Sequence, residues 1–135
     1  FLALPQAPVG SNAVLVFGAG YSGAQLAELD WIRTANVLYW GDADADGYAI
    51  LNALRSHMPV PGAVRSVGMD SATVEEFLHL SVTDPGDPTR HLPHLTEEEE
   101  CARRLLVTRG NRRLEQERVS LDWVLAQDAF AAIWG

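Results

Sequence analysis

The chain has 135 residues, 47% hydrophobic and 21% charged, a composition typical of one folded globular domain and not of a disordered segment. Its formal net charge of −8 argues against a surface that holds nucleic acid unaided. No apolar run reaches the roughly 20 residues of a membrane-spanning helix, and the one cysteine, Cys101, lacks a partner for an internal disulfide, so we expect a cytoplasmic protein without a membrane segment.

Apolar runs alternate with helical patterns in the first half of the chain. The run over residues 13–17 predicts a strand, and apolar residues at helical spacing over 26–32 predict a helix after it. The next strand is expected over residues 37–40, followed by a helix around 48–54 and a weaker strand over 63–69. This alternation predicts an α/β fold in which helices flank a parallel sheet.

The second half predicts a loop and then helices. Ser71 or Thr73 is placed to cap a short helix, and residues 81–93, rich in proline and aspartate, predict a surface loop. The segment from Thr96 to Glu99 predicts a capping box, with its charge run on a solvated helix face that carries Glu–Arg pairs four residues apart. A last helix is expected to begin at Ser120.

These elements predict a single domain over residues 1–135. Its core is expected at about residues 13–80, and a helical extension at about residues 94–135. A chain of this length is enough for one domain with a core, but not for two.

The acidic run from Asp42 to Gly47 directly follows the predicted strand over 37–40. Successive side chains of an extended segment alternate sides, so Asp42, Asp44 and Asp46 can point the same way. Three neighbouring carboxylates repel one another, and a divalent cation such as Mg²⁺ (or Mn²⁺) removes that penalty. Because open parallel sheets place their sites at the carboxyl ends of strands, the run predicts a metal site there.

Two other interpretations of the acidic run stay open. A calcium-binding EF-hand loop begins with the same pattern, but it needs a glutamate at its twelfth position, where this chain has Ala53, and a helix before it. Alternatively, an aspartate ahead of Tyr48 caps the following helix in the ordinary way. Capping alone does not require three aspartates in alternation.

A second candidate site is the segment Gly18-Ala-Gly20-Tyr-Ser-Gly23, a complete G-x-G-x-x-G pattern between a predicted strand and a predicted helix. In a dinucleotide-binding fold such glycines let the backbone approach a pyrophosphate, and Asp42 stands where a ribose-binding acid is expected. Gly18, Gly20 and Gly23 therefore define an alternative NAD- or FAD-binding module. The same glycines also suit a tight strand-to-helix turn without a ligand.

The run from Asp42 to Gly47 resembles the Asp-x-Asp-x-Asp-Gly signature of Toprim domains in type II topoisomerases. The longer string from Val37 to Leu51 resembles the C-terminal Toprim domain of the nuclease subunit, JetD or MksG, of the Wadjet anti-plasmid defence system. Further matching pieces follow the family's order up to about Trp123, so the resemblance covers nearly all of the chain. They are Phe1 to Pro5, Phe17 to Tyr21, Met69 and Asp70 with Thr73, and Leu114 to Arg118.

The resemblance implies a Toprim-like Rossmannoid fold and a Mg²⁺-dependent DNA endonuclease that acts with an SMC-like complex against plasmids. Asp42 and Asp44 match the paired metal ligands and are the expected catalytic residues, and Asp46 matches a third, more peripheral acid. Glu115 and Glu117 match an additional acidic pair of the family. A homodimer formed through the full-length protein is a further expectation.

The alternative for Glu115 and Glu117 is a salt-bridged pair beside Arg113 and Arg118. For the whole chain, the remaining alternative is a non-catalytic interaction domain in which the acids of the run serve as helix caps.

Toprim chemistry in the family also uses a glutamate, which lies just upstream of the segment that matches Phe1 to Pro5. No acidic residue precedes Glu28 in this chain. We therefore expect a fragment that begins just after that glutamate, binds Mg²⁺ or Mn²⁺ weakly, and cleaves DNA poorly or not at all.

Overall fold

The computed structural model describes residues 6, 9–14, 16 and 23–134. This part of the chain contains helices and two small sheets, and none of its helices is long and apolar enough to cross a membrane. The elements in chain order are α1 (Gly23–Ala27), α2 (Asp30–Arg33), β1 (Val37–Tyr39), α3 (Ala45–His57), β2 (Val64–Ser66), α4 (Ser71–Phe77), β3 (Val82–Thr83), α5 (Glu97–Thr108), β4 (Arg112–Arg113), α6 (Leu121–Leu125) and α7 (Asp128–Trp134), with 3-10 turns at Pro61–Ala63, Leu78–Leu80 and Gln116–Arg118.

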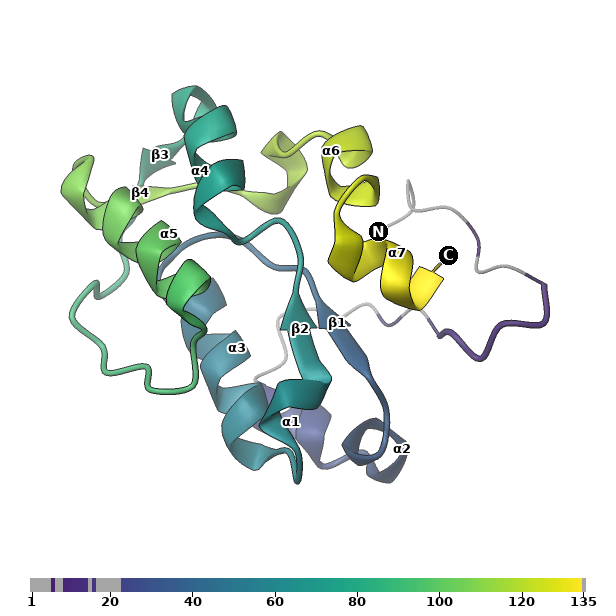
Figure 1. Ribbon diagram of the computed structural model, residues 1–135. Coiled ribbons are helices and arrows are strands. Elements are labelled where there is room, and N and C mark those ends of the chain that lie inside the picture. The colour runs from purple at the N-terminus through teal and green to yellow at the C-terminus, as the bar shows by residue number, and fades with distance from the viewer. Residues whose placement is uncertain (1–5, 7–8, 15, 17–22, 135) are drawn as a thin grey trace.

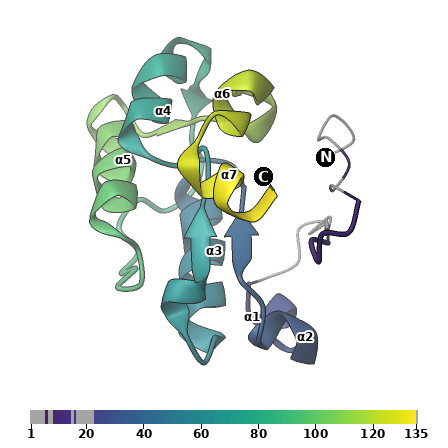
Figure 2. The ribbon, with the colours of Figure 1, turned by 45° about the vertical axis from the view of Figure 1, so that its right-hand side comes forward.

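The first sheet is the parallel pair β1 and β2, joined through α3 (Figure 1). Val37 lies opposite Val64 in its register. The predicted strand–helix–strand unit is therefore confirmed, with two strands in the part of the chain that the structure describes. Both strands point toward α4 and α6, so the loop after β1 lies at that end of the sheet (Figure 2).

The strand predicted over residues 13–17 is not present at Ala13, Val14 or Val16, and its other two residues lie outside the described part. The helix predicted over 26–32 is divided into α1 and α2, because the chain turns at Glu28 and Leu29. The helix predicted from Ser120 is likewise divided into α6 and α7.

The core lies between α3, the sheet and the helices of the second half. Tyr48, Leu51 and Leu54 recur at helical spacing on α3 and are at most 1% exposed. The Tyr48 hydroxyl donates to the Met69 carbonyl oxygen at 2.9 Å, which satisfies the polar group of this buried side chain. Among the described residues, the other large side chains that are fully buried are those of Val64, Val67, Met69, Thr73, Val74, Leu114 and Val124.

The second sheet corrects the prediction that residues 81–93 form a loop throughout. Strand β3 pairs with β4 in antiparallel fashion, with Val82 opposite Arg113. β-Branched Val82 and Thr83 suit a strand, but the partner that pairs with them is distant in sequence, so the local pattern did not reveal it. The short helix α4 also differs in its cap: the Asp70 side chain, rather than Ser71 or Thr73, accepts from a backbone N–H at the helix start.

The capping box at the start of α5 is confirmed, because Thr96 and Glu99 each bind the other's backbone N–H. The prediction that this charge run lies on a solvated helix face is nevertheless wrong for Glu99. It is 3% exposed, and its two carboxylate oxygens accept from Arg55 at 2.5 and 2.9 Å. Arg103, its expected partner, pairs with Glu100 at 3.4 Å, while the expected pair of Glu100 with Arg104 is present at 3.7 Å.

Burial alone would raise the pKa of Glu99. Hydrogen bonds from Arg55, Ser66 and the Thr96 backbone outweigh burial, so the pKa of Glu99 lies below its usual range. Arg55 also donates to the carbonyl oxygens of Val64 and His94, which adds two hydrogen bonds to this ion pair. The pair therefore ties α3 to β2 and α5.

We predict that Glu99→Gln lowers the free energy of unfolding at pH 7 by about 3 kcal/mol, because it leaves Arg55 buried without its charged partner. Since the folded-state pKa of Glu99 is lowered, its contribution is present above its unfolded pKa and is lost as pH falls through the folded value. The difference between the variant and the wild type should therefore shrink in acid. Urea unfolding measures both effects. Glu97→Gln, an exposed change in the same helical turn, is the control, and equal losses in the two variants would contradict the assignment.

Candidate functional site

The backbone between β1 and α3 fixes the direction of Asp42 and Asp44. Ala43 N–H donates to the Leu114 carbonyl oxygen at 2.9 Å, and Leu114 N–H donates back to Ala43 at 3.0 Å, forming an isolated antiparallel bridge. Ala43 and Leu114 are each 1% exposed, so both side chains belong to the core. Because side chains alternate along extended backbone, Asp42 and Asp44 point away from the core, beside the residues that flank Leu114.

Asp42 and Asp44 have the same pattern of contacts. The Oδ1 atom of Asp42 accepts from Gln116 N–H at 2.7 Å, and its Oδ2 atom lies 3.6 Å from Nη2 of Arg113. The Oδ1 atom of Asp44 accepts from Gly47 N–H at 2.6 Å, and its Oδ2 atom lies 3.5 Å from Nε of Arg113. Each carboxylate is thus anchored to the backbone through one oxygen and faces the same guanidinium through the other.

Asp44 is the N-cap of α3, so the capping interpretation is correct for one of its oxygens. Burial raises the pKa of Asp44 above its usual range. The Gly47 N–H opposes that effect, Asp42 and Asp84 reinforce it, and Arg113 opposes it in turn. Because the net direction is upward, the positive charge of Arg113 does not compensate for burial and the neighbouring carboxylates.

Asp46 departs from the predicted alignment. The extended backbone ends at Asp44 and α3 begins at Ala45, so Asp46 lies in the first helical turn, where its side chain is 69% exposed and pairs with Arg90 at 2.8 Å. Asp42, Asp44 and Asp46 still line one groove. Within the part of the chain that the structure describes, no three aspartate, glutamate, histidine or cysteine side chains are close enough to one another to hold a metal ion.

Asp84 is a further buried acid beside the acidic run, and no sequence motif singled it out. It is 7% exposed and lines the same groove. Its Oδ2 atom accepts from Ala45 N–H at 2.9 Å, and its Oδ1 atom accepts from Gly86 N–H at 2.8 Å. The second contact is an Asx-turn, and the Asp-Pro-Gly sequence was the local signal for it. Asp84 thereby connects the loop after β3 to the start of α3 through hydrogen bonds.

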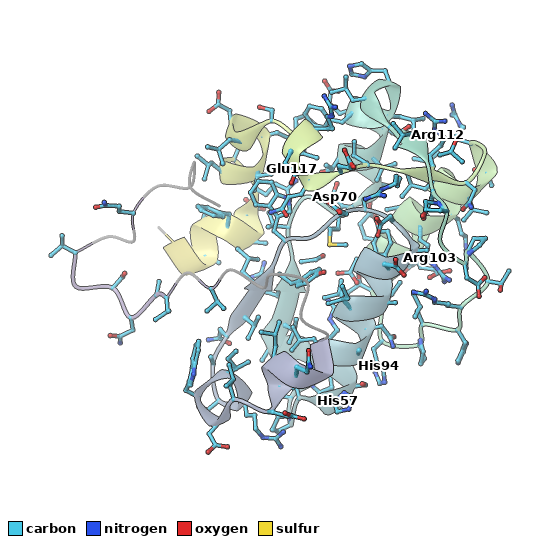
Figure 3. The ribbon with its side chains drawn as sticks, turned by 180° about the vertical axis from the view of Figure 1, so that it is seen from behind. His57, Asp70, His94, Arg103, Arg112 and Glu117 are labelled. Carbon is cyan, nitrogen blue, oxygen red and sulfur yellow. The ribbon has the colours of Figure 1, made fainter. Side chains whose placement is uncertain are left out.

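Glu115 and Glu117 lie on the segment that follows the bridge. Glu115 Oε1 is 3.6 Å from Nη2 of Arg113, so the predicted pairing with that arginine is present. Glu117 is exposed in the 3-10 turn and lines the groove (Figure 3). The bridge therefore brings Glu115 to the acidic run, while Glu117 lies at the groove wall.

Two alternatives remain to be compared with the structure: an EF-hand loop at the acidic run and a dinucleotide site at the glycine segment. A strand precedes the acidic run, and Ala53 lies inside α3, an arrangement that excludes an EF-hand loop. For the dinucleotide alternative, Gly18 and Gly20 lie outside the described residues, and Gly23 is the first residue of α1. The structure therefore adds no support for a cofactor at these glycines.

One known protein family matches a part of the chain that includes both segments of the site. A family model described as "Wadjet protein JetD, C-terminal" matches residues 1–128. The matched range includes the acidic run and the segment after β4 that bridges to it. No curated protein matches the chain.

The acidic run ends in a glycine, Gly47, because this position has no room for a side chain. A methyl group at Gly47 would overlap the backbone carbonyl oxygen of Asp42. We predict that Gly47→Ala lowers the free energy of unfolding by about 2 kcal/mol, since the loop that carries Asp42 must shift. At Gly62 the same group would meet nothing within 4 Å, so Gly62→Ala should change stability by no more than about 0.5 kcal/mol. Urea unfolding compares the two, and similar values would contradict this explanation.

A second prediction separates the cap from the charge of Asp44. In chelator-treated protein, Asp44→Ala should cost about 1 kcal/mol through loss of the cap, whereas asparagine caps as well as aspartate. Because the folded-state pKa of Asp44 is raised, its ionisation opposes folding, and wild-type stability falls as pH rises through that value. Asp44→Asn should therefore gain stability relative to the wild type between acid and neutral pH. Denaturant unfolding at both pH values tests this, and equal losses for Asn and Ala would refute it.

Proposed function

The chain belongs to the C-terminal family of the Wadjet protein JetD, a component of Wadjet anti-plasmid systems, and from this premise we propose that it cleaves DNA. The proposed reaction is phosphodiester cleavage that depends on Mg²⁺ or Mn²⁺ held by Asp42 and Asp44. One observation carries this proposal: each of the two carboxylates has one oxygen anchored by a backbone N–H and the other turned toward a shared cation, the guanidinium of Arg113.

The donor set of Asp42 and Asp44 fits a Mg²⁺ ion. Such an ion takes hard oxygen ligands and commonly one or two carboxylates, and it keeps water molecules that a substrate phosphate replaces. The anchored pair meets this requirement without further ordering of the two side chains. The guanidinium of Arg113 occupies the position beside both Oδ2 atoms, which supports a preference for positive charge there. Asp46 is the proposed peripheral acid, with Arg90 as its partner.

Bound at this pair, a divalent ion would stabilise the negative charge that develops on a phosphodiester in the transition state. The chain's own contribution is to hold the two ligands in place through the bridge and the N-cap. Arg90, which pairs with Asp46, has a side chain that is 38% exposed, and it is the proposed cation for a phosphate contact. Because the net charge is −8, we propose that DNA is delivered by the other parts of the assembly, including an SMC-like complex.

The metal prediction is tested by calorimetric titration of Mn²⁺ into the wild type and Asp44→Asn. The wild type should bind weakly, and Asp44→Asn should lose binding by at least about tenfold, because it removes one charged ligand while keeping the cap. Asp30→Asn, a change of the same charge on α2, should bind like the wild type. Plasmid nicking in Mg²⁺ should follow the same order. Equal Mn²⁺ affinity in wild type and Asp44→Asn would contradict the proposal.

A further inference from the structure

Arg113 lies among three carboxylates without a short contact to any of them. Its Nη2 atom is 3.6 Å from Oδ2 of Asp42 and 3.6 Å from Oε1 of Glu115, and its Nε atom is 3.5 Å from Oδ2 of Asp44. The Nε–H is buried and has no hydrogen-bond partner. An unmet buried donor is unfavourable, so the guanidinium is held here by charge rather than by hydrogen-bond geometry.

The backbone, rather than the guanidinium, determines this position. Leu114 is fixed by its bridge to Ala43, and Arg113 is the residue before it on β4. The alternation of side chains sends Arg112 to the other side, where its Nε atom donates to the Ser81 hydroxyl at 3.0 Å (Figure 3). The neighbouring arginines therefore differ: Arg112 is hydrogen-bonded to Ser81, the residue before β3, and Arg113 faces the acidic pair.

A comparison with Arg55 distinguishes a structural arginine from Arg113. Arg55 makes two hydrogen bonds to Glu99, at 2.5 and 2.9 Å, and donates to two backbone carbonyl oxygens as well. Its side chain is 4% exposed, whereas that of Arg113 is 28% exposed. Direct, bidentate bonds hold a guanidinium firmly, and Arg113 has none of them in its contacts with the carboxylates. Little is therefore lost when Arg113 leaves the acidic pair.

We propose that Arg113 is an internal cation that neutralises Asp42 and Asp44 in the metal-free protein and withdraws when a divalent ion binds. The inference rests on the proposed function and names the residue that sets the metal affinity of the same site. Glu115 gives the withdrawn guanidinium a partner, because it already lies 3.6 Å from Nη2 and is outside the proposed ligand pair. Metal and arginine thus compete for the same two Oδ2 atoms.

The test is Mn²⁺ titration of the full chain and its Arg113 variants. Arg113→Gln should bind Mn²⁺ about tenfold more tightly than the wild type, because the competing charge is gone. Arg113→Lys keeps the charge and should remain within about threefold of the wild type. Arg109→Gln removes the same charge from an exposed position at the end of α5 and should also leave affinity unchanged.

The outcomes separate this inference from the proposed function. Unchanged or weaker binding by Arg113→Gln overturns the inference, while loss of binding in Asp44→Asn leaves the metal site standing. Tight binding that disappears when Asp44→Asn is added to Arg113→Gln supports both. Tight binding that persists in that double variant, or no binding by any protein, overturns both.

A measurement on the wild type keeps the inference testable if Arg113→Gln does not fold. Mg²⁺ should accelerate exchange of the Arg113 Nε–H with water in nuclear magnetic resonance spectra, because withdrawal exposes this buried group. The Arg55 Nε–H, which donates to the Val64 carbonyl oxygen at 3.1 Å, should not change. Saturation with Mg²⁺ that leaves exchange at Arg113 unaltered would overturn the inference.

Discussion

The backbone bridge between Ala43 and Leu114 is the constraint on which the candidate site depends. Two hydrogen bonds and two buried side chains fix the register of segments that are far apart in the sequence. Once that register is fixed, the alternation of side chains brings Asp42 and Asp44 beside Arg113. The polar site is therefore a consequence of how apolar residues pack on the opposite side of the same backbone.

The fold contains two different arrangements of arginine with carboxylates, one at Arg55 and one at Arg113. Arg55 and Glu99 form two direct hydrogen bonds and, with the bond from Arg55 to Val64, join three elements of the core. Around Arg113 the contacts are longer, one donor has no partner, and the pKa of Asp44 remains raised despite the nearby positive charge. The first arrangement stabilises the fold, and the second is an incompletely neutralised acidic pair of the kind that a divalent cation would complete.

Much of the fold near the site could be predicted from local sequence. Hydrophobic periodicity predicted β1, α3 and β2, and the capping box of α5 was evident from Thr96 and Glu99. The contacts of Asp84 with Ala45, of Arg113 with the acidic run and of Glu99 with Arg55 could not be predicted in this way, because each joins distant segments. Local patterns carry no information about which strand pairs with β3 or which arginine reaches a glutamate, and only the family resemblance marked the segment after β4 as relevant.

We propose that Asp42 and Asp44 are a prepared ligand pair whose cation in the metal-free protein is Arg113. A crystal of the protein containing Mn²⁺, measured at the manganese absorption edge, tests this most directly. We expect an anomalous peak within coordination distance of Oδ2 of Asp42 and Oδ2 of Asp44, with the guanidinium of Arg113 moved toward Glu115. A manganese peak elsewhere, with Arg113 still beside both carboxylates, would contradict it.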